Sequence, residues 1–423
     1  MNDGITLQEL PDAWEYCGLG EFCDFAGGTQ PPKNTFKNKS QDGYIRLLQI
    51  RDFESEDYAV FIPKQGRLRI VQEEDISIGR YGASVGRILT GKAGAINVAI
   101  MTTLPDTRRV DKRFLGYSLQ LSEFQQYLRG LGGRAAQAGF NRGEVCRFKF
   151  PLPPLCEQRK IAAVLGLVQR AIEQQERLIA LTTELKKALL HKIFTEGLRG
   201  EPQKQTDIGP VPKSWEVAPL GEYLTEAQYG ISTKGSESGQ YAVLRMTNQR
   251  QGRISSDNLQ YVELTSDQFQ KFRVERRDIL FNRTNSLELV GRTAIFDIEG
   301  DFVFASYLIR LRTITERLRP FFLNHYFNWD ETQARLKSIA TRAVSQSNIS
   351  ATRLRGFLVP VPKPDEQDKI VRQIDCLDQK LSVHMRKHAA LTALFRALLH
   401  QLMTARVRLE AVDLSELGFD IQP

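Results

Sequence analysis

The sequence predicts an α+β protein in which two similar globular modules are joined by two long helices that form a pseudo-two-fold symmetric antiparallel coiled coil. Two observations lead to this fold. The chain of 423 residues repeats itself, and each copy ends in a stretch whose apolar residues recur every 3.5 positions. The length gives room for two or three domains, each able to bury its own core.

The repeat is clearest where each helix is expected to begin. The segment PLPPLCEQRKI at 151–161 recurs as PVPKPDEQDKI at 360–370, an offset of 209 residues. The same offset brings 183–195 onto 392–404, with seven identical positions. Further upstream, Pro11, Trp14 and Leu19-Gly20-Glu21 match Pro212, Trp215 and Leu220-Gly221-Glu222 at an offset of 201, with little else in common between them. The modules therefore diverge while the helices stay alike.

This order predicts five segments along the chain. The modules occupy 1–150 and 201–359, the helical segments occupy 151–200 and 360–410, and a C-terminal tail covers 411–423. Prolines precede both helical segments, so an extended segment should stop before each helix.

The helices are expected to pair through a seam of positions spaced alternately by four and three. Seven of ten seam residues between 161 and 193 are apolar, and so are eight of ten between 370 and 402. Antiparallel pairing would make facing residue numbers add up to about 563, which sets Gln175 against His388 and Ile179 against His384 in a polar layer. His384 and His388 also have the spacing of two metal ligands on a helix, but no third ligand is near in sequence, so we expect no metal.

The residues expected to pair the helices or to dock partner subunits lie at the helix starts and along the seam. They are Glu157, Gln158, Ile161, Leu165, Gln175, Leu189, Glu366, Gln367, Ile370, His384, His388 and Leu398. Glu157 and Glu366 fall in the first helical turn, where a carboxylate interacts favourably with the helix dipole.

Within the modules, short apolar runs at 44–50 and 241–246 predict strands, and 112–130 and 320–338 predict closing helices. Loops rich in Gly, Arg, Lys, Asn, Gln, Ser and Thr separate them, including 342–348. Such side chains suit base edges and phosphates, although ordinary surface loops have the same composition. The candidate DNA contacts are Thr29, Lys33, Arg80, Tyr81, Ser84, Arg87, Lys234, Arg245, Asn248, Arg283, Asn285 and Ser347.

Composition narrows the class of protein. The net charge is +8, spread as +2, +3, +3 and zero over 1–150, 151–200, 201–355 and 356–423. This mild excess fits local polyanion-binding patches and equally an ordinary basic protein. No apolar window is long enough for a membrane span, and the N-terminus lacks the pattern of a secretory signal, so a cytoplasmic protein is expected. The five cysteines lack zinc spacing and are expected to be reduced, mostly buried thiols.

Catalytic motifs are not evident in the sequence. The segment Thr90-Gly91-Lys92-Ala93 lacks the rest of a phosphate loop, and neither double proline has the surroundings of an amino-methyltransferase motif. The acidic run 365–368 is similar to a nuclease carboxylate cluster, but its repeat partner at 156–159 keeps only one carboxylate. We expect no catalysis by this chain alone.

The duplicated order of Pro-x-x-Trp, Leu-Gly-Glu and Pro-x-Pro-x-x-x-Glu-Gln-x-x-Ile, from about residue 5 to 405, resembles the specificity subunit of type I restriction-modification systems. The resemblance implies that each module is a target recognition domain for one half of a bipartite double-stranded DNA sequence. It also implies that the helices space the domains and dock two DNA adenine methyltransferase subunits, with restriction endonuclease/translocase subunits joining them. The chain itself would bind no cofactor, since S-adenosylmethionine, ATP and Mg are used by the partners.

Two other functions remain open from the sequence. A stand-alone two-domain DNA-binding regulator would bind its site tightly without a partner. A nuclease with unfamiliar carboxylates would cleave DNA with magnesium as a single chain.

Overall fold

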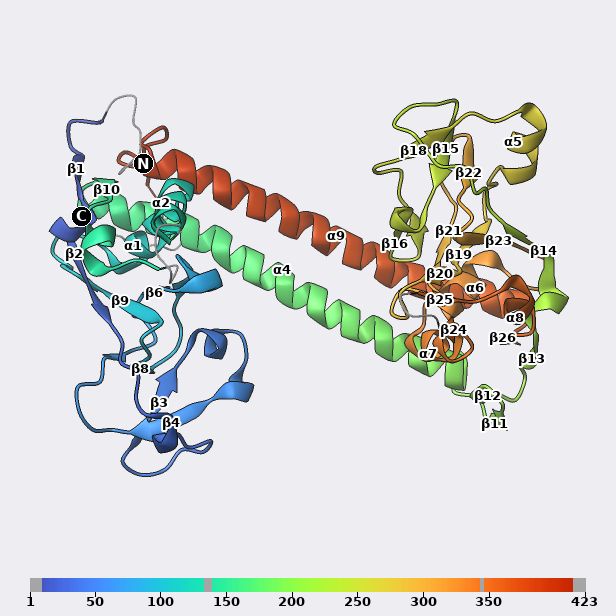
Figure 1. The fold of residues 1–423 in the computed structure, drawn as a ribbon, viewed down its shortest axis with the longest axis horizontal. Coiled ribbons are helices and arrows are strands. Elements are labelled where there is room, and N and C mark those ends of the chain that lie inside the picture. The colour runs from blue at the N-terminus through green and yellow to red at the C-terminus, as the bar shows by residue number, and fades with distance from the viewer. Residues whose placement is uncertain (1–9, 133–138, 343–345, 414–423) are drawn as a thin grey trace. The chain divides into compact units, whose positions relative to one another are not determined.

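The computed structural model describes residues 10–132, 139–342 and 346–413, and the chain divides into two compact units. Unit 1 comprises residues 1–176 and 387–423, and unit 2 comprises 177–386. Two long helices, α4 (Leu155–Glu196) and α9 (Pro364–Met403), each begin in one unit and end in the other (Figure 1). Each unit is therefore one module with half of each helix. The segment boundaries stay predictions, and most of the predicted tail lies outside the described residues, as does part of the loop 342–348.

The described residues of unit 1 form three sheets. A two-stranded ribbon pairs β1 (Glu15–Gly18) with β10 (Lys149–Leu152). A four-stranded sheet has the order β2 (Cys23–Gly27), β9 (Ile100–Pro105), β6 (Ser77–Gly79), β7 (Ile88–Leu89). A second four-stranded sheet has the order β4 (Val60–Pro63), β3 (Tyr44–Leu48), β8 (Gly94–Ile96), β5 (Ile70–Val71), and its β3 and β8 are parallel. The helices are α1 (Lys112–Ser118), α2 (Ser122–Gly132) and α3 (Arg142–Cys146).

Unit 2 repeats this plan with additions. The ribbon pairs β13 (Glu216–Pro219) with β26 (Leu358–Val361). A six-stranded sheet has the order β14 (Leu224–Tyr229), β23 (Leu308–Thr313), β19 (Ile279–Asn282), β21 (Thr293–Ile295), β17 (Arg253–Ile254), β16 (Gln249–Arg250). The sheet β18 (Gln260–Val262), β15 (Tyr241–Leu244), β22 (Phe302–Phe304) again holds one parallel pair, β15 with β22.

The additions in unit 2 are small. They include the strands β16 and β17 of the six-stranded sheet, the sheet β20 (Thr284–Asn285), β25 (Ser347–Asn348), β24 (Thr341–Arg342) and the hairpin β11 (Gln203–Thr206), β12 (Gly209–Pro212). The helices of the module are α5 (Ser266–Phe272), α6 (Pro320–Phe327), α7 (Asp330–Ser338) and α8 (Ala351–Arg355). No helix in the described ranges is long and apolar enough to cross a membrane.

The strands predicted at 44–50 and 241–246 are confirmed as β3 and β15, but each predicted closing helix is interrupted. The segment 112–130 forms α1 and α2, and 320–338 forms α6 and α7. One cause is common to both breaks. The Gln125 amide donates to the Leu119 and Gly86 carbonyls, and the Gln333 amide donates to the Phe327 and Gly291 carbonyls. A side chain thus replaces the backbone donor that a continuous helix would supply.

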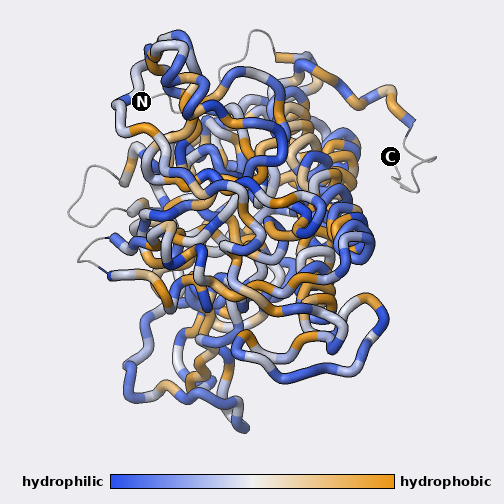
Figure 2. The backbone as a smooth tube through the Cα atoms, turned by 90° about the vertical axis from the view of Figure 1, so that its right-hand side faces the viewer, coloured by the Kyte–Doolittle hydropathy of each residue, from blue (hydrophilic) through white to orange (hydrophobic). Residues whose placement is uncertain are grey.

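The seam predicted along the long helices is confirmed, because none of its positions is exposed. Ile161 and Leu165 of α4 lie in the same core as Phe395 and Leu402 of α9, inside unit 1. In unit 2, α4 contributes Leu190, Ile193 and Phe194, and α9 contributes Ile370 and Ile374. Hydrophobic and hydrophilic residues are interspersed along the backbone (Figure 2). The helix pair is therefore part of each module's core.

Pairing between α4 and α9 is antiparallel, with a register close to the predicted one. Glu176 lies 3.1 Å from His388 in unit 1, and Lys186 lies 2.5 Å from Asp378 in unit 2. The numbers 176 and 388, and 186 and 378, both add up to 564, against the predicted 563. His388 thus contacts the neighbour of Gln175, and the specific pairs Gln175 with His388 and Ile179 with His384 stay predictions.

Glu157 lies in the first turn of α4, as predicted for an interaction with the helix dipole. Its side chain is also buried, with 1% exposed, and forms several hydrogen bonds. Its carboxylate accepts hydrogen bonds from the Trp14 indole at 2.9 Å, from Arg408 at 2.8 and 3.0 Å, and from the Leu409 backbone at 3.3 Å. Burial alone would raise the pKa of Glu157, but the bonds from Arg408 and Trp14 outweigh it and lower the pKa. Glu157 therefore ties the chain segment after α9 to the start of α4.

Because the pKa of Glu157 is lower in the folded chain than its usual value of 4.5, the group stabilises unit 1 above that value and loses this effect as the pH falls below it. We predict that Glu157→Gln lowers the free energy of unfolding of unit 1 by about 1–3 kcal/mol at neutral pH. The difference from wild type should narrow as the pH falls below 4.5 and through the lowered pKa of Glu157, because the wild-type carboxyl then becomes protonated too. Thermal unfolding at neutral pH and at a series of acidic pH values measures this, and a loss that stays constant with pH would contradict it.

Candidate DNA interface

Arg80 and Arg283 occupy equivalent places in the two modules. Arg80 follows β6 and Arg283 follows β19, two strands that are buried throughout. The backbone N–H of Arg80 donates to the Ala99 carbonyl at 2.8 Å, and that of Arg283 donates to the Tyr307 carbonyl at 3.0 Å. Both acceptors lie on a loop or turn before the next strand of the same sheet, β9 or β23. Arg80 and Arg283 therefore occupy the same backbone position, at the same end of the equivalent sheet in each module.

The guanidinium groups of these two arginines are held in similar ways. The Arg80 group lies 4.8 Å from the Tyr81 ring centroid, and its Nε donates to the Phe140 carbonyl at 2.8 Å. The Arg283 group lies 4.6 Å from the Tyr229 ring centroid and donates to the Ser306 carbonyl at 3.3 Å. Within the described ranges, neither arginine forms an ion pair with a carboxylate. Each is an oriented cation whose charge remains available to an anion.

One glycine in each module fixes the loop beside the arginine. A Cβ on Gly28 would lie 2.1 Å from the Ile96 carbonyl oxygen, and a Cβ on Gly230 would lie 2.2 Å from that of Phe304. Next to them, the Thr29 N–H donates to the Ile96 carbonyl, and the Ile231 N–H donates to the Phe304 carbonyl. Only glycine allows this approach, so the loop path is the same in both modules.

The other residues predicted to contact DNA differ in accessibility. Lys33 and Lys234 are exposed. The Thr29 hydroxyl is buried without a hydrogen-bond partner in the described part of the chain, and the Arg283 Nε is in the same state. Arg87 forms an ion pair with Glu54, which occupies its charge.

Several side chains predicted to contact DNA form hydrogen bonds or strand pairs within their own loops. Asn248 is 1% exposed, and its amide donates to the Ser255 and Asp257 carbonyls. Ser347 is buried in β25, where it pairs with Asn285 of β20. The Ser84 hydroxyl donates to the Tyr81 carbonyl, and the Arg245 side chain donates to the Asn258 carbonyl. These side chains shape the loops, and Asn248 and Ser347 are too buried to be offered to a ligand.

Two exposed aromatic residues were missed in the sequence. Tyr229, below the Arg283 guanidinium, is 40% exposed, and Tyr307, whose carbonyl accepts from Arg283, is 46% exposed. The Tyr229 hydroxyl also accepts a hydrogen bond from the Ala351 N–H at 2.8 Å. The only signal for Tyr229 was its place before Gly230, and exposure cannot be derived from that.

Gln158 and Gln367, predicted for helix pairing or docking, instead hold each module to its long helix. Both are fully buried, with 0% exposed. The Gln158 amide accepts from the Asp111 N–H at 2.8 Å and donates to the Arg109 and Pro153 carbonyls, each at 2.8 Å. The Gln367 amide accepts from the Arg319 N–H at 2.7 Å and donates to the Arg317 and Pro362 carbonyls at 2.9 and 2.8 Å.

The remaining predicted pairing residues lie where the seam requires. Ile161, Leu165 and Ile370 are fully buried, while Leu189, Leu398 and Glu366 are half-buried. Gln175, His384 and His388 are half-buried at mid-length.

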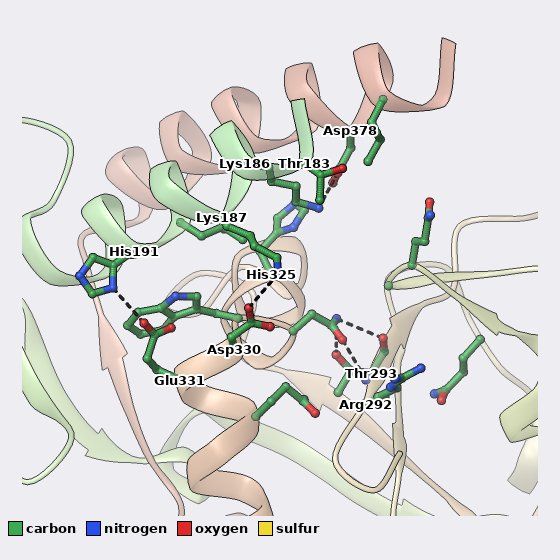
Figure 3. Close-up of a pocket in the computed structure, with 18 of the residues that line it drawn as sticks. Thr183, Lys186, Lys187, His191, Arg292, Thr293, His325, Asp330, Glu331 and Asp378 are labelled. Carbon is green, nitrogen blue, oxygen red and sulfur yellow. Dashed lines mark hydrogen bonds and ion pairs between the residues drawn. The ribbon is translucent and has the colours of Figure 1, made fainter. Parts of the chain in front are cut away.

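A cavity of about 650 Å³ lies in unit 2 between α4 and the module (Figure 3). Its wall carries ion pairs, Lys186 with Asp378, Lys187 with Asp330 and His191 with Glu331. His325, Asp375 and Asp378 place three possible metal-ligating atoms within 4.8 Å of one another. However, Arg253 pairs with Asp375 as Lys186 does with Asp378, so both carboxylates are already neutralised. This arrangement suits a packing contact better than a cation site.

An open groove of about 600 Å³ lies between α4 and α9 in unit 2 and is mostly apolar. Its lining includes Leu185, which is 56% exposed. At the offset of 209, the matching positions in unit 1 include Leu394, Leu167 and Val407, which are 46%, 41% and 40% exposed. Both units thus expose apolar side chains at equivalent places on the helix pair.

Comparison with known proteins agrees with this duplicated plan. Over 410 residues, the chain is 22% identical to the type I restriction enzyme MjaVIII specificity subunit of Methanocaldococcus jannaschii, covering 96% of this chain and 95% of that one. It is also 22% identical to the EcoKI specificity subunit of Escherichia coli K12, covering 88% and 84%. The crystal structure of the type I S subunit from M. genitalium matches with a TM-score of 0.62 at 16% identity, over 94% of this chain and 99% of that one.

The model of the type I restriction modification DNA specificity domain matches residues 11–183 and again 212–393. These two stretches cover most of the chain, and each contains one module with the start of the helix that follows it. The chain therefore belongs to the type I restriction-modification DNA specificity family and carries two copies of its domain.

Proposed function

We propose that this chain gives a type I restriction-modification complex its sequence specificity, with each module contacting one half of a bipartite DNA target. The observation that carries the proposal is the matched pair Arg80 and Arg283. Each is an oriented guanidinium free of carboxylates, and this is the side chain best suited to bidentate contact with guanine or phosphate. Tyr307, which accepts from the Arg283 N–H, is exposed, and so are Lys33 and Lys234, which follow Gly28 and Gly230 in the sequence; these side chains would complete the two surfaces.

We further propose that two adenine methyltransferase subunits dock on the helix pair, one on each unit. The support is the duplication of exposed apolar positions, Leu185 in unit 2 and Leu394 in unit 1, which would offer the same contact twice to copies of one partner. A stand-alone DNA-binding regulator would have no use for these exposed leucines.

In this proposal the chain performs no catalytic step itself. The methyltransferase partners would use S-adenosylmethionine, and restriction subunits would use ATP and magnesium. The role of this chain would be to bind DNA, to orient it and to hold the partners.

The two matched arginines are predicted to contribute to DNA binding. Arg80→Ala and Arg283→Ala should each weaken DNA binding by about 1–3 kcal/mol, because each removes a prepositioned cation. If the arginine contacts a base, one position in its own half-site should become degenerate. If it contacts a phosphate, binding of all sequences should weaken alike. Adenine methylation maps and binding titrations distinguish these outcomes.

Arg108→Ala is the matched control, since Arg108 is 88% exposed and already pairs with Asp106. This change should leave the methylation map unaltered. If both Arg80→Ala and Arg283→Ala leave binding and methylation unchanged, these loops do not contact DNA.

Docking of the methyltransferase subunits is predicted to depend on the two exposed leucines. Leu185→Glu and Leu394→Glu should each remove one methyltransferase subunit from the complex, and the double variant should remove two. Both leucines are exposed, so the chain itself should stay folded. The mass of the complex by light scattering measures this. Leu104→Glu, at another exposed leucine, on β9, is the control, and a double variant that still carries two subunits would contradict the assignment.

A further inference from the structure

The side chains of Gln158 and Gln367 form the same joint twice. Each amide uses its oxygen and both of its N–H groups, and corresponding distances in the two units differ by no more than 0.1 Å. Both residues are 0% exposed, so neither can touch DNA or a partner. Any influence they have on recognition must pass through the position of the module.

Each glutamine bonds to three places in the chain that together define how the module meets the helix. Asp111 and Arg319 immediately precede α1 and α6, and their N–H groups are the donors. Pro153 and Pro362 lie between the last strand of the module and the long helix. In each unit, one glutamine side chain near the start of the long helix therefore holds two chain segments in place. One is the backbone just before α1 or α6, and the other is the connection between the last strand of the module and the long helix.

Two positions near each glutamine carry side chains of opposite charge, and the signs of the two charges are exchanged between the units. In unit 2, Arg319 forms a bidentate ion pair with Asp368, both distances being 3.0 Å. The corresponding positions in unit 1, at offsets of 208 and 209, are Asp111 and Arg159. Opposite charges thus occur at the same two positions in both units, although the modules otherwise share few residues.

We propose that Gln158 and Gln367 are positioning residues that set the angle of each recognition module on its helix and thereby the number of base pairs between the two half-sites. The inference rests on the proposed function. Because α4 and α9 each continue from one unit into the other, a change of angle at either joint changes the spacing of the two DNA-contacting surfaces. One base pair moves a half-site by about 3.4 Å and rotates it by about 34°, so a stiff joint should discriminate single base pairs.

The test uses the full chain in complex with its methyltransferase subunits. A methylation map of wild type supplies the two half-sites, and plasmids then carry them with spacers shortened or lengthened by one and two base pairs. Wild type should methylate one spacer length. In Gln158→Met and Gln367→Met, the preference for that spacer should fall by roughly tenfold while the half-site sequences stay the same, because a looser joint absorbs the mismatch.

Gln379→Met, at an exposed glutamine of α9, is the matched control and should keep the wild-type preference. If the Met variants fail to fold, Asp368→Asn removes only the partly exposed ion pair at the same joint and should broaden the preference in the same direction. An unchanged, sharp spacer preference in folded variants would overturn the inference alone. A wild-type map without a split motif would instead overturn the proposed function, and the inference with it.

Discussion

The structure depends on the burial of one apolar seam that belongs to two helices and two cores at once. Ile161 and Leu165 at one end of α4 pack in the core of unit 1, and Ile193 and Phe194 at its other end pack in the core of unit 2. Helix α9 does the same in the opposite direction. Neither module completes its core from its own residues. Residues of α9 more than 200 positions beyond the first module pack in the core of unit 1, and residues of α4 that precede the second module pack in the core of unit 2. This packing explains why the helical segments stay alike while the modules diverge.

Several of the contacts that repeat in the two units fix the backbone. Gln158 and Gln367 hold backbone groups of the module, Gln125 and Gln333 end the first closing helix, and Gly28 and Gly230 allow a close approach of loops. Contacts that do not fix backbone are free to differ. The Trp14 indole donates to Glu157, whereas the Trp215 indole is buried without a partner in the described part of unit 2. The repeated contacts to the backbone therefore hold both modules in the same way.

The fold could be predicted from the sequence because its main signals are periodic or duplicated. The seam followed from residue spacing and the strands β3 and β15 from short apolar runs, while the register followed to within one residue once the helices were taken as antiparallel. The breaks between α1 and α2 and between α6 and α7 could not be predicted, since they depend on a glutamine reaching a carbonyl six residues before it and another on a distant loop. The candidate DNA contacts were the hardest part to predict from the sequence. Asn248 and Ser347 have the chemistry of base contacts, but their burial follows from tertiary packing that no local pattern encodes.

The matched arginines also limit what can make two half-sites different. Arg80 and Arg283 share backbone position, an aromatic neighbour and freedom from carboxylates, so by themselves they would offer the same contact to both halves of a target. Differences in recognition must then come from positions where equivalent backbone carries unlike side chains. Tyr81, beside the Arg80 guanidinium, corresponds to Thr284 in the second module, where Tyr229 lies beside Arg283 instead. A shared cation would set the register on DNA, and these neighbours would decide the bases.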